Sequence, residues 1–209
     1  MAQYFSVHPQ NPQPRLIRQA ADIVRHGGVI VYPTDSCYAL GCRLGDKDAE
    51  RELRRIRDLD EQHHLTLMVR DLSEIAVYAR VDNQQFRLLK AHTPGAYTFI
   101  LQATREVPRR LQHPKRATIG IRVPDHPVAL ALLEALGEPL LSTTLILPGE
   151  ALPLNDAEEI RERLGNRVAL ILDAGSCGVE PTTVIDLTGE SPVVLRKGRG
   201  SLASFGLEH

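Results

Sequence analysis

The sequence contains no tryptophan, only 4% aromatic residues and three cysteines. Cys37, Cys42 and Cys177 are odd in number and lack the spacing of zinc ligands, so neither a disulfide framework nor a metal site is indicated. No apolar stretch approaches the roughly 20 residues that a membrane helix needs. The N-terminus carries no signal-peptide pattern. We therefore expect a cytoplasmic protein with no membrane partner and no metal-binding site formed by its own side chains.

A net excess of either charge is also missing, since the formal net charge is −1. Basic residues nevertheless gather between positions 105 and 122, against the single acid Glu106. Such a run forms either a solvated face or a surface for a polyanion such as RNA. The low aromatic content disfavours base stacking on single strands, so double-stranded RNA or tRNA is the form considered. The candidate RNA-binding residues are Arg109, Arg110, Lys115 and Arg116.

The chain of 209 residues, with 43% hydrophobic and 24% charged residues, has the size and composition of one globular domain. We assign residues 1–206 to this domain. The final Leu207-Glu208-His209 has the pattern of an expression-tag remnant.

Helical and strand patterns alternate along the chain. Residues 1–13 suggest an extended lead-in or edge strand. Helices are expected at 14–26, 46–58, 72–79, 82–92, 124–136 and 156–164, and strands at 28–32, 65–69, 97–102, 117–123, 140–147, 168–172, 183–187 and 192–196. The turn Thr188-Gly189-Glu190-Ser191 joins the last two strands as a hairpin. This order predicts an α/β fold with one mixed sheet covered by helices.

Polar groups follow the buried strand at 28–32. Pro33 ends the strand, and Thr34, Asp35 and Ser36 come next. In open α/β sheets, ligands bind in the crevice outside the carboxyl ends of strands. The same residues are also ordinary turn formers and helix caps. Both interpretations remain open on spacing alone.

Three arginines stand out for chemistry. Arg122 lies inside an apolar strand, where an unpaired charge would be costly, so we expect it to face a polar crevice or to meet Asp125 or another acid. Arg55 and Arg57 lie at the end of a helix, and their guanidinium groups suit phosphate. Surface ion pairs with Glu50 and Glu52 are the alternative. The chain has no Gly-x-x-x-x-Gly-Lys phosphate loop.

Five motifs, in order, resemble those of the YrdC/YciO family of threonylcarbamoyl-adenylate synthases and their relatives, and its YciO branch most. They are Tyr32-Pro33-Thr34-Asp35-Ser36-Cys37-Tyr38-Ala39-Leu40-Gly41, Pro94-Gly95-Ala96-Tyr97-Thr98, Ile121-Arg122-Val123-Pro124-Asp125-His126-Pro127, Ser142-Thr143-Thr144 and Pro181-Thr182-Thr183-Val184-Ile185-Asp186. The resemblance covers almost the whole chain. It implies a single, strongly twisted, open mixed sheet with a large concave cavity.

The resemblance also implies an activity, a nucleotidyl transfer in which ATP, L-threonine and bicarbonate give threonylcarbamoyl-AMP for tRNA modification. Mg²⁺ would accompany ATP. The implied catalytic residues are Arg55 and Arg57. The implied substrate-binding residues are Thr34, Ser36, Thr98 and Arg122, and the implied nucleotide-binding residues are Ser142, Thr144, Thr182 and Arg196. The alternative is an RNA-binding module of the same fold without the full chemistry.

Two positions depart from the family pattern. Arg55 replaces the lysine of a Lys-x-Arg motif, and these two side chains are not equivalent at a tight site. Ile146 replaces an asparagine of the family's Ser-x-Asn pair, so a polar contact is lost. Loss of one such contact commonly costs on the order of a hundredfold in rate. We therefore expect reduced or altered synthase activity, in a monomer or weak homodimer.

Overall fold

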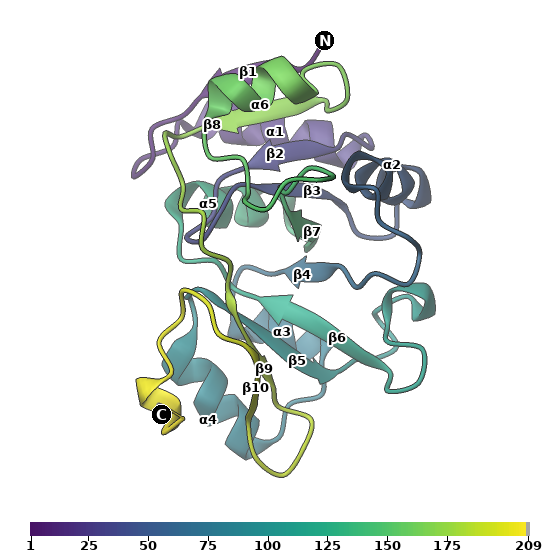
Figure 1. Ribbon diagram of the computed structural model, residues 1–209, viewed down its shortest axis with the longest axis vertical. Helices are drawn as coiled ribbons and strands as arrows, with labels where there is room; N and C mark the ends of the chain where they lie inside the picture. The colour runs from purple at the N-terminus through teal and green to yellow at the C-terminus, as the bar shows by residue number, and fades with distance from the viewer. Residues whose placement is uncertain (208–209) are drawn as a thin grey trace.

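The computed structural model describes residues 1–207; the last two residues of the predicted tag remnant, 208–209, lie outside the described part. A single ten-stranded mixed sheet forms the centre of the molecule, with strand order β1-β8-β2-β3-β7-β4-β6-β5-β9-β10 (Figure 1). The strands are β1 (Gln3–Ser6), β2 (Ile30–Tyr32), β3 (Ala39–Arg43), β4 (Thr66–Met68), β5 (Tyr97–Gln102), β6 (Thr118–Arg122), β7 (Leu140–Thr144), β8 (Leu170–Asp173), β9 (Thr183–Asp186) and β10 (Val193–Arg196). The predicted α/β class and single mixed sheet are confirmed.

Six α-helices flank this sheet: α1 (Pro14–Arg25), α2 (Lys47–Arg57), α3 (Leu72–Tyr78), α4 (Asn83–His92), α5 (Pro127–Leu136) and α6 (Ala157–Leu164). Two 3₁₀ turns, η1 (Arg109–Leu111) and η2 (Ala203–Phe205), complete the elements. Three of these helices begin with an aspartate cap: the carboxylates of Asp46, Asp82 and Asp156 each accept a backbone N–H of the helix that follows. No helix within residues 1–207 is long and apolar enough to cross a membrane.

Alternating side chains divide the core between the two faces of the sheet. On β2, Ile30 and Tyr32 pack with α1 and α5, whereas Val31 belongs to the larger core on the opposite face. Figure 1 shows α1 and α5 side by side behind β2 and β3. The larger core also receives Leu53 of α2 and Ile160 of α6.

Helices α1 and α5 cover one end of this sheet face. Toward β9, neither of these two helices covers the face. Cross-strand pairs place Ala39 opposite Thr144, Thr66 opposite Ser142 and Met68 opposite Arg122. Thr98 pairs with Val184 further along. Because paired residues share a face, the middle of this face carries small and polar side chains.

Two strands, β3 and β7, differ from the prediction made from the sequence. Strand β3 was not predicted, because Ala39-Leu40-Gly41 lacks the β-branched residues that favour strands. It forms because β2 and β7 pair with it on both sides in antiparallel fashion. Gly41 also makes room for the ring of Tyr32, whose Cε1 would lie 2.8 Å from a Cβ at position 41. Strand β7 ends at Thr144, and the predicted continuation to Leu147 is irregular chain.

Candidate functional site

A cavity of about 320 Å³ lies over the polar part of the sheet face. Its lining comes from β3, β4, β5, β6, β7 and β9, together with the end of α2 and of β10. Gly120 lines the cavity without a side chain. A Cβ at this position would lie 3.3 Å from Cγ2 of Thr98, so a side chain there would crowd Thr98. Eight of the predicted site residues line this one cavity: Ser36, Arg57, Thr98, Arg122, Ser142, Thr144, Thr182 and Arg196.

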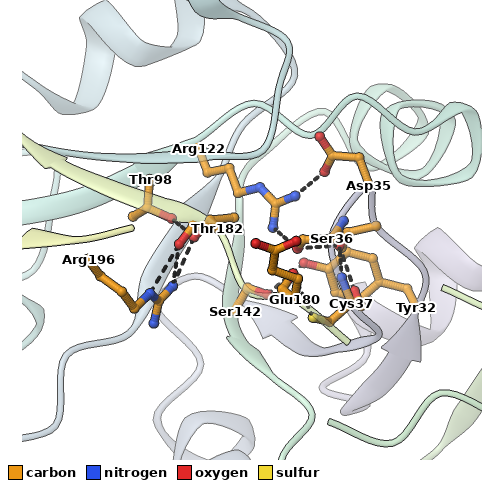
Figure 2. Close-up of polar contacts among 11 residues, drawn as sticks. Tyr32, Asp35, Ser36, Cys37, Thr98, Arg122, Ser142, Glu180, Thr182 and Arg196 are labelled. Carbon is orange, nitrogen blue, oxygen red and sulfur yellow. Dashed lines mark hydrogen bonds and ion pairs between the residues drawn. The ribbon is translucent and has the colours of Figure 1, made fainter. Parts of the chain in front are cut away.

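Arg122 forms one wall of the cavity and is buried, with its side chain 7% exposed. Its guanidinium forms an ion pair with Asp35, and Nη1 donates a hydrogen bond to Oγ of Ser36 at 3.0 Å (Figure 2). The sequence predicted an acid partner, with Asp125 as the first suggestion; the partner is Asp35. Within the described residues, Nε of Arg122 is buried without a hydrogen-bond partner. This wall is therefore strongly polar, with one donor left unsatisfied.

Thr98, Thr182 and Arg196 form a second polar cluster in the same cavity (Figure 2). The hydroxyls of Thr98 and Thr182 are 2.8 Å apart. Arg196 donates from Nε and Nη2 to the carbonyl oxygen of Thr182, at 3.1 and 2.9 Å, and from Nη2 to its hydroxyl at 3.1 Å. These contacts join the start of β9 to β5 and to the end of β10.

Arg57 extends from the last residue of α2 into the cavity. Its Nε donates to the carbonyl oxygen of Ile146 at 2.8 Å, and its Nη1 donates to the hydroxyl of Thr143 at 2.5 Å. Burial lowers the pKa of Arg57, but a guanidinium stays charged in proteins. The side chain is thus held by β7 and the loop after it, with further donors left for a ligand.

Ser142 lines the cavity, but its hydroxyl is bound within the protein. It donates to the carbonyl oxygen of Leu40 at 3.1 Å, so the hydroxyl of Tyr32 is the donor in the 2.6 Å contact between Tyr32 and Ser142. Burial raises the pKa of Tyr32, which keeps that donor protonated. Ser142 therefore supports the floor of the cavity.

Thr34 lies directly behind Ser36 and is 3% exposed. Its hydroxyl donates to the carbonyl oxygen of Cys37 at 2.6 Å and accepts from the backbone N–H groups of Ser36 and Cys37. Thr34 thus fixes the turn that presents Ser36, and it lines a neighbouring hollow with Asp35. Thr34 is therefore a turn-forming residue outside the cavity, whereas Ser36 lines the cavity.

Arg55 does not accompany Arg57. Helix α2 continues to Arg57, so residues two apart point in different directions. The side chain of Arg55 is 68% exposed, pairs with Glu52 at 3.2 Å and lines a different groove.

The four predicted RNA-binding residues do not form one cluster. Arg110 pairs with Glu50 of α2 at 3.1 Å, whereas Arg116 pairs with Asp186 of β9 at 2.7 Å. Arg109 lines the same groove as Arg55. Lys115 lies exposed between them in sequence.

Two residues that were not among the predicted site residues, Asp35 and Thr143, hold Arg122 and Arg57 in place. Both lie inside motifs that the sequence analysis had named, but their pairing with the arginines could not be seen from the sequence.

No group of three or more His, Cys, Asp or Glu residues placed to hold a metal ion occurs within residues 1–207.

The chain is thus an open α/β sheet with one cavity lined by arginines and hydroxyls, side chains whose chemistry suits small anions. The chain belongs to the Sua5/YciO/YrdC family, whose sequence model, described as "Telomere recombination", matches residues 22–198. The family resemblance seen in the five motifs is thereby confirmed.

Similar sequences and similar structures support this family assignment. Escherichia coli (strain K12) YciO is 60% identical over 205 residues, which cover 98% of this chain and all of the relative. Its crystal structure matches with a TM-score of 0.93. The threonylcarbamoyl-AMP synthase of Halorhodospira halophila is 32% identical and covers 90% of this chain and 98% of its own. P. abyssi Sua5 complexed with L-threonine is 27% identical with a TM-score of 0.85, over 93% of this chain and 57% of that one.

Proposed function

We propose that the protein forms threonylcarbamoyl-AMP from ATP, L-threonine and bicarbonate in this cavity, at a reduced rate. The observation that carries the proposal is the presence of Arg57, Arg122 and Arg196 around one hollow. The similarity to threonylcarbamoyl-AMP synthases and to Sua5 with L-threonine supports the choice of substrates.

The proposed reaction begins with carboxylation of the threonine amine by bicarbonate, with loss of water. An oxygen of the resulting carbamate attacks the α-phosphorus of ATP, the bond to the β-phosphate oxygen breaks, and diphosphate leaves. The protein contributes positioning and charge neutralisation. Arg57 and Arg196, with the hydroxyls of Thr144 and Thr182, would bind phosphates.

Threonine would lie against the Arg122 wall. Arg122 and Ser36 line the cavity side by side, and the guanidinium of Arg122 is suited to an amino-acid carboxylate, which prefers charge-assisted donors. Thr98 would border the same subsite, since its hydroxyl contacts Thr182. Mg²⁺ would enter as the partner of the ATP phosphates.

Ile146 is the reason to propose a reduced rate. It lines the cavity, and its side chain offers neither donor nor acceptor where the family has asparagine. The carbonyl oxygen of Ile146 still accepts from Arg57, so the arginine keeps its support.

Diphosphate release tests this function. Purified protein should release diphosphate only when ATP, L-threonine and bicarbonate are all present, and Arg57→Ala should abolish the release. Release that ignores threonine, or that survives Arg57→Ala, would contradict the proposal.

Double-stranded RNA or tRNA binding is the second candidate. Exposed Arg109 and Lys115 favour it, since duplex RNA is bound mainly through shape and phosphates. RNA affinity should fall steeply as salt rises, and a flat salt response would exclude this function.

A further inference from the structure

A further hollow, of about 820 Å³, lies on the α2 side of the cavity. We call it the α2–η1 groove, because helix α2, the segment 59–64 and the turn at η1 line it. Its basic lining residues are Lys47, Arg51, Arg54, Arg55, Arg109 and Arg110. Among the residues that the structure describes, two acids, Glu50 and Glu61, line it as well. The groove therefore carries an excess of positive charge.

The base of the groove is a built network. The side chains of Glu50 and Arg54 are each 10% exposed and lie 3.6 Å apart at their charged ends. Glu50 also accepts from Nε and Nη2 of Arg110, at 3.2 and 3.1 Å. The single carboxylate is shared between two guanidinium groups, which leaves the base of the groove positive.

Arg54 shapes the side of the groove that faces the cavity. Its Nη1 donates to the carbonyl oxygens of Asp60 and His63, both at 2.8 Å. These bonds fix the segment that carries His63 and His64. Both histidines line the groove and the cavity, so the two hollows meet there.

The rim of the groove carries cations that are available to a ligand. Arg51 and Arg55 are 69% and 68% exposed. Within residues 1–207 their ion pairs are with Asp48 and Glu52 on their own helix, both at 3.2 Å. Exposed pairs of this kind are weak and exchange readily for a better anion. Arg109 forms no ion pair within residues 1–207.

We propose that the α2–η1 groove is a second anion site that binds an oligophosphate, and that it receives the diphosphate released in the cavity. The assignment of the diphosphate source rests on the proposed function. Arg57 in the cavity and Arg55 in the groove are two residues apart on α2, with His63 and His64 at the junction. A leaving diphosphate can thus pass from one set of guanidinium groups to the next without losing its counter-charge. Guanidinium forks suit such phosphates.

Titration calorimetry with inorganic diphosphate tests the site without requiring catalysis. Arg57→Ala, which disables the cavity, should retain one diphosphate site. Adding Arg51→Ala and Arg109→Ala should weaken that site by about tenfold for each arginine. As the control, Arg15→Ala and Arg18→Ala are added to Arg57→Ala instead. Both arginines are exposed on α1, and their loss should leave the diphosphate affinity of Arg57→Ala unchanged. All these side chains are solvent-exposed apart from Arg57, and melting curves check that the variants fold.

Two results would overturn the proposal. One is loss of all diphosphate binding in Arg57→Ala. The other is equal diphosphate affinity in the variant that also carries Arg51→Ala and Arg109→Ala and in the control that also carries Arg15→Ala and Arg18→Ala. A short RNA duplex added as competitor distinguishes the source of the phosphates, and it should leave diphosphate affinity unchanged. Displacement of diphosphate by the duplex would mean that the groove holds a polynucleotide backbone instead. Diphosphate binding in the groove by a protein that makes no threonylcarbamoyl-AMP would keep the site and reject only the proposed function.

Discussion

Arg57 enters the cavity with two of its five N–H donors already bound, to the Ile146 carbonyl and the Thr143 hydroxyl. The remaining donors keep a fixed direction because these two bonds hold the plane of the guanidinium. Fixed donors bind an anion with less loss of side-chain entropy than mobile ones. This arrangement is the physical basis for assigning phosphate binding to Arg57.

Replacing Arg57 by alanine should weaken ATP binding by at least about tenfold, because a charge-assisted bidentate contact is lost. Arg57→Lys should not restore the affinity, since the ammonium cannot reach both supports and the ligand in one plane. Calorimetry measures the affinity, and thermal melting checks the fold. Equal ATP affinity in Arg57→Ala would remove the phosphate role from this residue.

Replacing Ile146 by asparagine should raise the rate of diphosphate release by about tenfold or more, if one missing polar contact limits the reaction. The backbone carbonyl that supports Arg57 is unchanged in this variant. Ile146→Val is the matched control, because it opens a little space without adding a polar group. An identical rate in both variants would show that the missing amide does not limit turnover.

At the scale of elements, the pair of Arg122 and Asp35 ties β6 to the loop after β2. Asp35→Ala should lower the free energy of unfolding by about 3–5 kcal/mol, because it leaves a buried arginine without its partner. Asp35→Asn keeps an acceptor and should cost less. Urea unfolding measures both variants. A small and equal loss in the two would show that Arg122 finds another partner.

His126 caps α5 through Nδ1, which accepts the N–H of Val128 at 3.1 Å and must be unprotonated to do so. Burial lowers the pKa of His126, and the charges of Asp35 and Asp125 only partly oppose this. A lowered folded-state pKa means that stability is full above about pH 6.5 and falls as the pH drops toward the folded value.

His126→Asn should remove this part of the acid-side slope, because asparagine caps a helix without titrating. Urea unfolding at several pH values from about 8 to about 5 measures the slope of the unfolding free energy against pH. His126→Ala should lose about 1 kcal/mol near neutral pH for want of a cap. Parallel curves for His126→Asn and the unaltered protein would contradict the assignment.

Elements with their own local signals were predictable from the sequence, as α2 shows. Asp46 caps it, Leu53 and Ile56 mark its buried side, and Asp58 ends it in the left-handed conformation. Strand β3 was not predictable, since only its partners β2 and β7 make it a strand. The site shows the same limit: the sequence identified Arg122 as buried and paired, but only the tertiary fold selects Asp35 over Asp125.

At the scale of the whole molecule, the strand order explains why the motifs are so far apart in sequence. Strands β7, β4, β6, β5 and β9 are neighbours in the sheet although the chain visits them in another order. The start of the chain lies at one end of the sheet and its last described turn near the other (Figure 1). Residues that are far apart in the sequence, such as Ser36, Arg122 and Thr182, therefore meet over one face of the sheet.

A structure determined after soaking with a non-hydrolysable ATP analogue and L-threonine would show whether the cavity holds both substrates. We expect phosphate density against Arg57 and Arg196, and the threonine carboxylate against Arg122 and Ser36. Nucleotide and amino acid bound away from these four side chains, or an empty cavity at saturating ligand, would contradict this expectation.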